Sequence, residues 1–166
     1  KGTMIFDDSY NASPVAVLMS LRDMAAAERL PSQRLVACLG EMRELGEQAE
    51  MLHRRVAQEV AVLKYDLLVV SGVWANAMAD EAKKQGLPEE RIVIVNDAPE
   101  AGILIQDWMR TGDFILAKAS EGPGPNSPNF GKVKGVRMER VTKELMADPL
   151  HATQLLCRQE GGWIEE

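Results

Sequence analysis

The sequence contains five short runs that are rich in apolar residues, and longer segments with helical periodicity separate them. The runs are Met4–Asp7, Leu35–Leu39, Leu67–Val70, Ile92–Val95 and Phe114–Ala117. Strands without polar alternation are typical of sheets that are covered on both faces. Repeated strand–helix–strand units favour parallel pairing through right-handed crossovers. The pattern therefore predicts an α/β fold, built as a three-layer, Rossmann-like, mostly parallel sheet.

The segments between the runs carry signals for helix starts and stops. Ser13 followed by Pro14 is typical of a helix N-cap and first helical residue. Asp97 is suited to cap a later helix, which we expect Gly112 to end. A further helix is predicted over Val73–Gln85, with a terminating glycine directly after it.

The C-terminal part of the chain is less regular. The segment Glu121–Gly135 contains four glycines and three prolines, which predicts a loop. A final helix is expected over Val136–Met146. The polar tail His151–Glu166 could form an extra strand or an extension specific to this protein.

Composition excludes several classes of protein. With 166 residues, 46% hydrophobic and 27% charged, the chain suits one compact domain. Its net charge of −6 argues against a nucleic-acid partner, because phosphate neutralisation needs cations. No apolar stretch reaches the length of a membrane span. Cys38 and Cys157, the only cysteines, are too far apart for a metal motif and fit a reducing, cytoplasmic location.

Polar residues follow the predicted strands at the edge where parallel sheets bind ligands. The richest end is Asp7–Asn11, where a carboxylate could accept hydrogen bonds from ribose hydroxyls. The same residues could simply build a turn and cap the next helix, and composition alone favours that alternative. The Lys118–Ser120 end could hold a carboxylate or phosphate, or could present a solvated lysine. No P-loop or GxGxxG motif is present.

Two histidines without clustered carboxylates do not predict a metal site. His53 lies at the edge of the apolar face of its predicted helix, near Val56 and Ala57. Proton transfer is possible there, but a packed or capping histidine is the favoured interpretation.

Several motifs carry a family resemblance. Asp7–Pro14 resembles the signature DDSYNANP, and Leu39–Glu47 resembles LGDMLELGE, with His53 placed where a histidine follows. Ile115–Ser120 resembles the strand that leads into a KGSR motif, and Val136–Val141 resembles the helix beyond it. These motifs belong to the C-terminal domain of the Mur ligases, and specifically of those that add D-alanyl-D-alanine.

The resemblance runs from Met4 to Leu145 and implies a domain over residues 1–149, with 150–166 as a tail. It implies an ATP-dependent, ADP-forming amide ligase that joins D-Ala-D-Ala to UDP-MurNAc-tripeptide in peptidoglycan precursor synthesis. In such enzymes an N-terminal domain holds the UDP-sugar peptide and a central P-loop domain holds ATP and Mg²⁺. This chain starts at Lys1 without a methionine, so we expect a piece of a longer polypeptide, although a processed terminus or trimmed tag is an alternative. Alone, the chain should be inactive and should contain no catalytic residue.

Carried over by position, the resemblance assigns a contact with the ATP ribose to Asp8. It places Tyr10 and Asn11 in the interdomain cleft, near nucleotide and substrate. It places Lys118 and Ser120 near the incoming dipeptide.

The sequence also departs from the family pattern. Ser13 replaces an asparagine, Ala119 replaces the glycine of KGSR, and Glu121 stands where its arginine belongs. Arg137 could supply the missing cation to the substrate if Glu121–Gly135 is an insertion. Two alternatives stay open. One is a degenerate Mur-like module that binds a nucleotide or a protein without ligase activity. The other is an amide ligase for a different amino acid.

Overall fold

The computed structural model describes residues 2–122 and 136–159 and contains a single five-stranded sheet in them. All four strand pairings are parallel, in the order β1-β5-β2-β3-β4. The strands are β1 (Met4–Asp7), β2 (Leu35–Leu39), β3 (Leu67–Val70), β4 (Ile92–Ile94) and β5 (Phe114–Lys118). The predicted parallel α/β fold is therefore confirmed.

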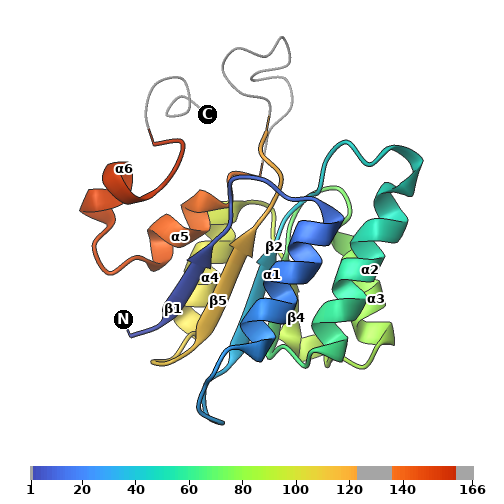
Figure 1. Ribbon diagram of the computed structural model, residues 1–166, viewed down its shortest axis with the longest axis horizontal. Coiled ribbons are helices and arrows are strands. Elements are labelled where there is room, and N and C mark those ends of the chain that lie inside the picture. The colour runs from blue at the N-terminus through green and yellow to red at the C-terminus, as the bar shows by residue number, and fades with distance from the viewer. Residues whose placement is uncertain (1, 123–135, 160–166) are drawn as a thin grey trace.

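Helices cover both faces of the sheet (Figure 1). They are α1 (Pro14–Ala26), α2 (Ala49–Val62), α3 (Ala75–Lys84), α4 (Ala98–Trp108), α5 (Glu139–Leu145) and α6 (Ala152–Leu155). Three short 3-10 turns, η1 (Gly46–Gln48), η2 (Glu89–Arg91) and η3 (Pro149–His151), precede α2, β4 and α6.

Strand order explains which helix covers which face. The chain steps in one direction from β1 through β2 and β3 to β4, so right-handed crossovers put α1, α2 and α3 on one side. The step back from β4 to β5 puts α4 on the other side, where α5 packs against it. Two cores result, because alternate residues of β2 and β5 face opposite helical layers.

Local capping agrees with the sequence at two helices. Ser13 Oγ accepts a hydrogen bond from Ala16 N at 3.3 Å and caps α1. Asp97 Oδ1 accepts one from Glu100 N at 2.9 Å and caps α4. Both predictions are confirmed, because a side-chain cap depends only on residues within one turn.

Other predicted boundaries were wrong. The helix expected from Val73 begins at Ala75, and the helix expected to reach Gly112 ends at Trp108. The helix predicted over Val136–Met146 begins only at Glu139, because Arg137 adopts a φ of 53°, in the left-handed region that does not continue a helix.

The end of the chain and the loop before α5 complete the description. Of the loop predicted over Glu121–Gly135, residues 123–135 lie outside the described residues. Of the tail, residues 150–159 form the end of η3, the short α6 and an irregular return, with no strand among them. The remaining residues, 160–166, also lie outside the described part.

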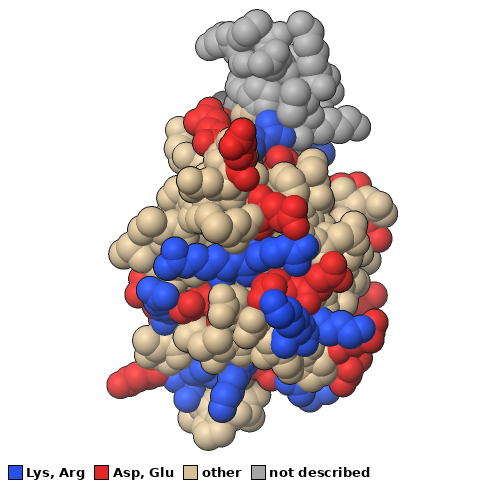
Figure 2. All heavy atoms as spheres, turned by 90° about the vertical axis from the view of Figure 1, so that its right-hand side faces the viewer, with Lys and Arg blue, Asp and Glu red and all other residues tan. Residues whose placement is uncertain are grey.

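Charges on the α2–α3 side of the molecule are interleaved (Figure 2). Ion pairs link Arg54 to Glu50 at 2.7 Å and Lys83 to Glu89 at 2.6 Å on this side. Figure 2 shows no broad single-sign patch over these two helices. Across the described residues, no helix has the length and apolarity needed to cross a membrane.

Candidate functional site

The candidate site lies at the carboxyl edge of β1, β5 and β2. The connections after β1 and β2 lead to α1 and α2 on one face, whereas the chain beyond β5 leads to α5 on the other. Such a reversal creates the crevice in which open parallel sheets bind ligands. The polar residues after β1 and β5 therefore flank the position that the topology favours.

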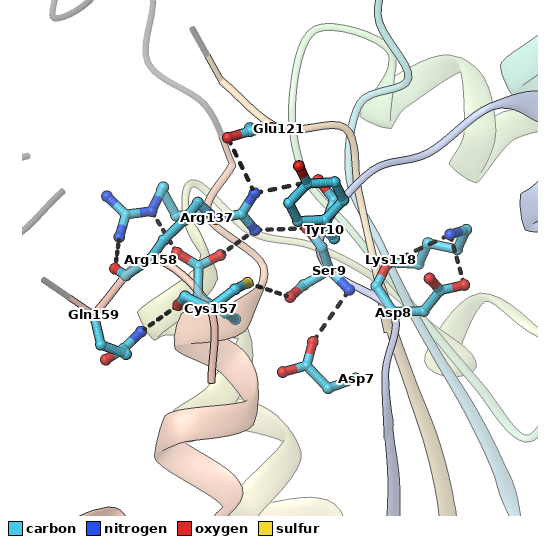
Figure 3. Close-up of polar contacts among 11 residues, drawn as sticks. Asp7, Asp8, Ser9, Tyr10, Lys118, Glu121, Arg137, Cys157, Arg158 and Gln159 are labelled. Carbon is cyan, nitrogen blue, oxygen red and sulfur yellow. Dashed lines mark hydrogen bonds and ion pairs between the residues drawn. The ribbon is translucent and has the colours of Figure 1, made fainter. Parts of the chain in front are cut away.

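Asp8 and Lys118 form the central pair of this site (Figure 3). Lys118 Nζ lies 2.6 Å from Asp8 Oδ2, and Ser20 Oγ donates to the same oxygen at 2.7 Å. The lysine side chain is only 2% exposed, whereas the Asp8 side chain is 45% exposed. Among the described residues, Asp8 Oδ1 accepts no hydrogen bond. The aspartate is thus anchored through one oxygen and open through the other.

Lys118 also supports the backbone of the turn after β1. Its ammonium donates to the carbonyl of Asn11 at 2.8 Å and lies 3.4 Å from the carbonyl of Asp8. Asn11 Oδ1 accepts from Ala12 N at 2.7 Å, while Tyr10 is 67% exposed. Asn11 therefore shapes the turn, while Asp8 and Tyr10 remain accessible. The predicted contact of Asp8 with ribose stays a prediction.

A surface cleft of about 420 Å³ opens beside Asp8, between β1 and α1. Its lining residues are Phe6, Asp7, Asp8, Ser20, Asp23, Met24, Ala27 and Leu116. The three carboxylates favour a ligand that donates hydrogen bonds, and they repel phosphate. The cleft combines apolar lining residues with carboxylates that accept hydrogen bonds from hydroxyl groups. Such a lining suits a sugar or a base better than a polyphosphate chain.

Ser120 connects the three loops at this edge. Its hydroxyl donates to the carbonyl of Ala12 at 2.8 Å and accepts from Arg43 N at 3.0 Å. Its backbone N–H donates to the Glu41 carbonyl at 2.8 Å. The residue is 6% exposed, so in this structure it holds loops together. Its predicted contact with the dipeptide stays a prediction.

The alanine at position 119 has a packing counterpart in Gly40. A Cβ added at Gly40 would lie 2.6 Å from the Cβ of Ala119, closer than side chains approach one another. Gly40 therefore leaves the space that the Ala119 methyl group occupies. The exchange of glycine for alanine in the KGSR-like segment is accommodated within the core.

His53 is a buried structural residue. Its Nε2 accepts a hydrogen bond from Met42 N at 2.8 Å, and its Nδ1 pairs with the Ala49 carbonyl at 2.7 Å. Burial lowers the pKa of His53 below its ordinary value of 6.5, although the Ala49 carbonyl and the charge of Glu41 act to raise it. The neutral ring holds the loop after β2, so the packed-histidine interpretation is confirmed.

Cys38 is equally structural. The residue is 1% exposed in the core under α4 and α5, and burial raises the pKa of its thiol to about 12. A thiol in that state is chemically inert near neutral pH. Within the described residues, no three His, Cys, Asp or Glu side chains gather as metal ligands.

A second charged cluster lies on the other side of the β1 turn (Figure 3). Glu139 is fully buried, and its carboxylate pairs with Arg137 Nε and, at 2.7 Å, with Arg158 Nη2. Glu121 Oε1 lies 4.0 Å from Arg158 Nη1. Burial acts to lower the pKa of Arg158, but the hydrogen bond and charge of Glu139 raise it overall.

The structure thus brings Asp8, Asn11 and Lys118 into one network. It places Arg137 in a separate cluster, where its guanidinium pairs with Glu139. Its predicted role toward the substrate stays a prediction.

Two contacts were missed from the sequence. Ser20 supports Asp8 from the second turn of α1, and a serine inside a helix is not a distinctive signal. Arg158 comes from the tail, which carries no periodicity that could have indicated its position.

The fold and this edge define a parallel α/β domain that presents an anchored aspartate and an exposed tyrosine beside an acidic cleft. The family model described as "Mur ligase, glutamate ligase domain" matches residues 1–121. The chain belongs to this family.

The chain is also similar to individual ligases. The UDP-N-acetylmuramoyl-tripeptide–D-alanyl-D-alanine ligase of Mycobacterium tuberculosis is 33% identical over 138 residues, which cover 74% of this chain and 27% of that enzyme. The Bacillus subtilis enzyme of the same name is 26% identical over 149 residues, covering 90% of this chain and 29% of the enzyme. The chain therefore spans less than a third of the length of these relatives.

The fold is similar to that of solved ligases. The MurF ligase from Thermotoga maritima, solved in complex with ADP, superposes with a TM-score of 0.62 at 24% identity. The match covers 94% of this chain and 30% of that one. At this identity the likeness supports the fold alone.

Proposed function

We propose that this chain is the C-terminal domain, over residues 1–149 with 150–166 as its tail, of an ATP-dependent, ADP-forming amide ligase. The ligase would join D-Ala-D-Ala to UDP-MurNAc-tripeptide in the cytoplasm. The proposal is supported by the family match, by relatives named for this reaction, and by the Asp8 network.

The Asp8 network is the observation that carries the proposal. Lys118 and Ser20 hold one carboxylate oxygen, and Asp8 lines the cleft, so the carboxylate is fixed beside the cleft before any ligand arrives. A carboxylate in that position accepts hydrogen bonds from ribose hydroxyls. Asp7 and Asp23 in the same cleft would repel phosphates. We infer that the sugar of ATP faces this domain while its phosphates point away.

The steps of the ligase reaction would be divided among three domains. ATP converts the tripeptide carboxylate into an acyl phosphate, and the amine of D-Ala-D-Ala displaces phosphate to form the amide. From the resemblance to this family, we assign Mg²⁺ and the phosphates mainly to a central P-loop domain. This chain would close over the nucleotide and exclude water from the acyl phosphate.

The test uses the full-length protein with ATP, UDP-MurNAc-tripeptide and D-Ala-D-Ala, and measures phosphate release. Asp8→Ala should raise the KM for ATP about tenfold, the cost of a lost charge-assisted hydrogen bond. The matched control is Asp107→Ala, which removes an exposed carboxylate on α4 and should leave the KM unchanged. An unaltered KM in Asp8→Ala would restrict Asp8 to shaping the turn.

A non-catalytic binding module is the second candidate. It is favoured by Glu121, which places a negative charge where the family motif carries a cation. Wild-type protein that has a P-loop but releases no phosphate would support this candidate. Activity with another amino acid, and none with D-Ala-D-Ala, would point instead to a different amide ligase.

A further inference from the structure

The tail of the chain reaches back to the turn after β1 (Figure 3). Arg158 Nη2 donates to the Ser9 carbonyl at 2.6 Å, and Nη1 donates to the Tyr10 carbonyl at 3.2 Å. Next to it, Cys157 Sγ lies 3.7 Å from Ser9 Oγ. One arginine therefore contacts two consecutive carbonyls of the turn that leads from Asp8 into α1.

The guanidinium of Arg158 is fixed from the opposite side as well. Glu139 accepts from Arg158 Nη2 at 2.7 Å, and Arg137 Nη2 donates to the Arg158 carbonyl at 2.9 Å. The Arg158 side chain is 4% exposed and Glu139 is fully buried. A buried carboxylate shared by two arginines favours this geometry for both guanidiniums, since moving away would leave the Glu139 charge with fewer partners.

Backbone conformation gives a second sign that this arrangement is specified. Arg137 has a φ of 53° and Arg158 a φ of 55°, both in the left-handed region that L residues rarely occupy. Residues held in such a conformation persist where surrounding contacts over-determine them. Here the surrounding contacts are the shared Glu139 and the two carbonyls of the turn.

We propose that Arg158 is a positioning residue, which holds the Ser9–Tyr10 backbone so that Tyr10 and Asp8 are presented to the nucleotide. The inference rests on the proposed function, because it assigns the turn to nucleotide binding. Lys118 supports the turn from the side of the sheet, at Asp8 and Asn11. Arg158 supports the two residues between them, so the turn is held along its whole length.

The same contact accounts for Glu121. Glu121, which stands at the position of the family cation, has its Oε1 4.0 Å from Arg158 Nη1. The negative charge of Glu121 is therefore paired with a positive charge from the tail. The cation at this corner of the site comes from the far end of the chain.

The test combines a structural and a kinetic readout on Arg158→Gln. Hydrogen exchange of the amides of residues 9–12, and KM and kcat for ATP, are measured on the full-length protein. We expect faster exchange in the turn and a KM for ATP raised about tenfold, the cost of ordering about one extra residue on binding. The kcat should change less than about twofold, because saturating ATP restores the ordered turn.

Two further variants separate positioning from general destabilisation. Arg158→Lys keeps the charge and one of the donors, so it should recover part of the affinity for ATP. Arg34→Gln breaks the similarly buried ion pair with Asp113, which lies at the amino ends of the strands, away from the turn. This variant should lower stability without changing the KM for ATP.

Each step of the proposal would be contradicted by a different result. Unchanged exchange in the turn of Arg158→Gln would show that the tail does not hold it. Faster exchange with an unchanged KM would separate the turn from nucleotide binding. Wild-type protein without ligase activity would refute the proposed function, whereas the exchange result would still decide whether Arg158 holds the turn.

Discussion

Two charged pairs lie at opposite ends of β5, and their surroundings differ. Just before the strand begins, Asp113 pairs with Arg34 at 2.5 Å, and just as it ends, Lys118 pairs with Asp8 at 2.6 Å. The Asp113 side chain is 1% exposed and the Asp8 side chain 45% exposed. The Arg34–Asp113 pair is therefore closed to solvent, whereas the Lys118–Asp8 pair is open to it. We call them the closed pair and the open pair.

Hydrogen-bond saturation explains the difference. Asp113 Oδ1 accepts from the backbone N and the Nε of Arg34, and Oδ2 accepts from Arg34 Nη2 and Arg110 N. The Arg34 guanidinium also lies 3.5 Å from the centre of the Trp108 ring. No acceptor capacity remains there for a ligand. Asp8 uses only one of its carboxylate oxygens for contacts within the protein. Of the two ends of β5, the carboxyl end is therefore the one whose ion pair can also bind a ligand.

The largest expected effect follows from breaking the closed pair. Arg34→Gln leaves the buried Asp113 carboxylate with backbone donors only, so the free energy of unfolding should fall by about 3 kcal/mol. For a chain of this length, that corresponds to a melting temperature lower by roughly 9 °C. Urea and thermal denaturation measure both values. A loss below about 0.5 kcal/mol would mean that the pair contributes no more than a surface ion pair.

Acid provides a second, smaller test of the same pair. Burial acts to raise the pKa of Asp113, but hydrogen bonds from Arg34 and Arg110 and the charge of Arg34 lower it overall, below its ordinary value of 3.8. The unfolded carboxyl group therefore takes up its proton at higher pH than the folded one. The contribution is present in full above the unfolded pKa and is lost as the pH falls through the folded pKa.

The measurement is a series of urea denaturations between about pH 5 and pH 3, around the carboxyl pKa range. Wild-type stability should fall over this interval more steeply than that of Arg34→Gln, in which the main cause of the lowered pKa is gone. Parallel pH profiles for the two proteins would rule out this account of Asp113.

Some parts of the molecule could be predicted from the sequence, and others could not. The strands were predictable, because uninterrupted apolar runs such as Leu35–Leu39 and Leu67–Val70 specify buried parallel strands. The caps at Ser13 and Asp97 were predictable because they depend on neighbours in sequence. The carboxyl edge followed from the parallel pairing that these elements imply.

What could not be predicted depends on contacts between distant segments. Arg158 contacts Ser9 across 149 positions, and no local pattern encodes such a pair. Lysine usually lies in solvent, so the burial of Lys118 under the turn was not expected from its residue type. The late start of α5 has the same origin, because Arg137 is held by Glu139 and the tail.

The smallest effect on stability, and the sharpest on binding, is expected from the open pair. Lys118→Met keeps the apolar stem and removes the ammonium group, and the half-exposed Asp8 can then be solvated by water. We expect stability to fall by less than about 1 kcal/mol, because a carboxylate in contact with water is not left unpaired. The KM for ATP should rise about tenfold, since Asp8 and the Asn11 carbonyl lose the donor that orients them.

Ser20→Ala is the graded control for this variant. It removes a neutral donor from the same Asp8 oxygen and leaves the charged one, so the KM should rise by no more than about fivefold. If Lys118→Met instead lost as much stability as Arg34→Gln and kept its affinity for ATP, both ends of β5 would be structural. The open oxygen of Asp8 would then be a consequence of its position at the edge of the sheet, and nucleotide contact would have to come from Tyr10 or from outside this turn.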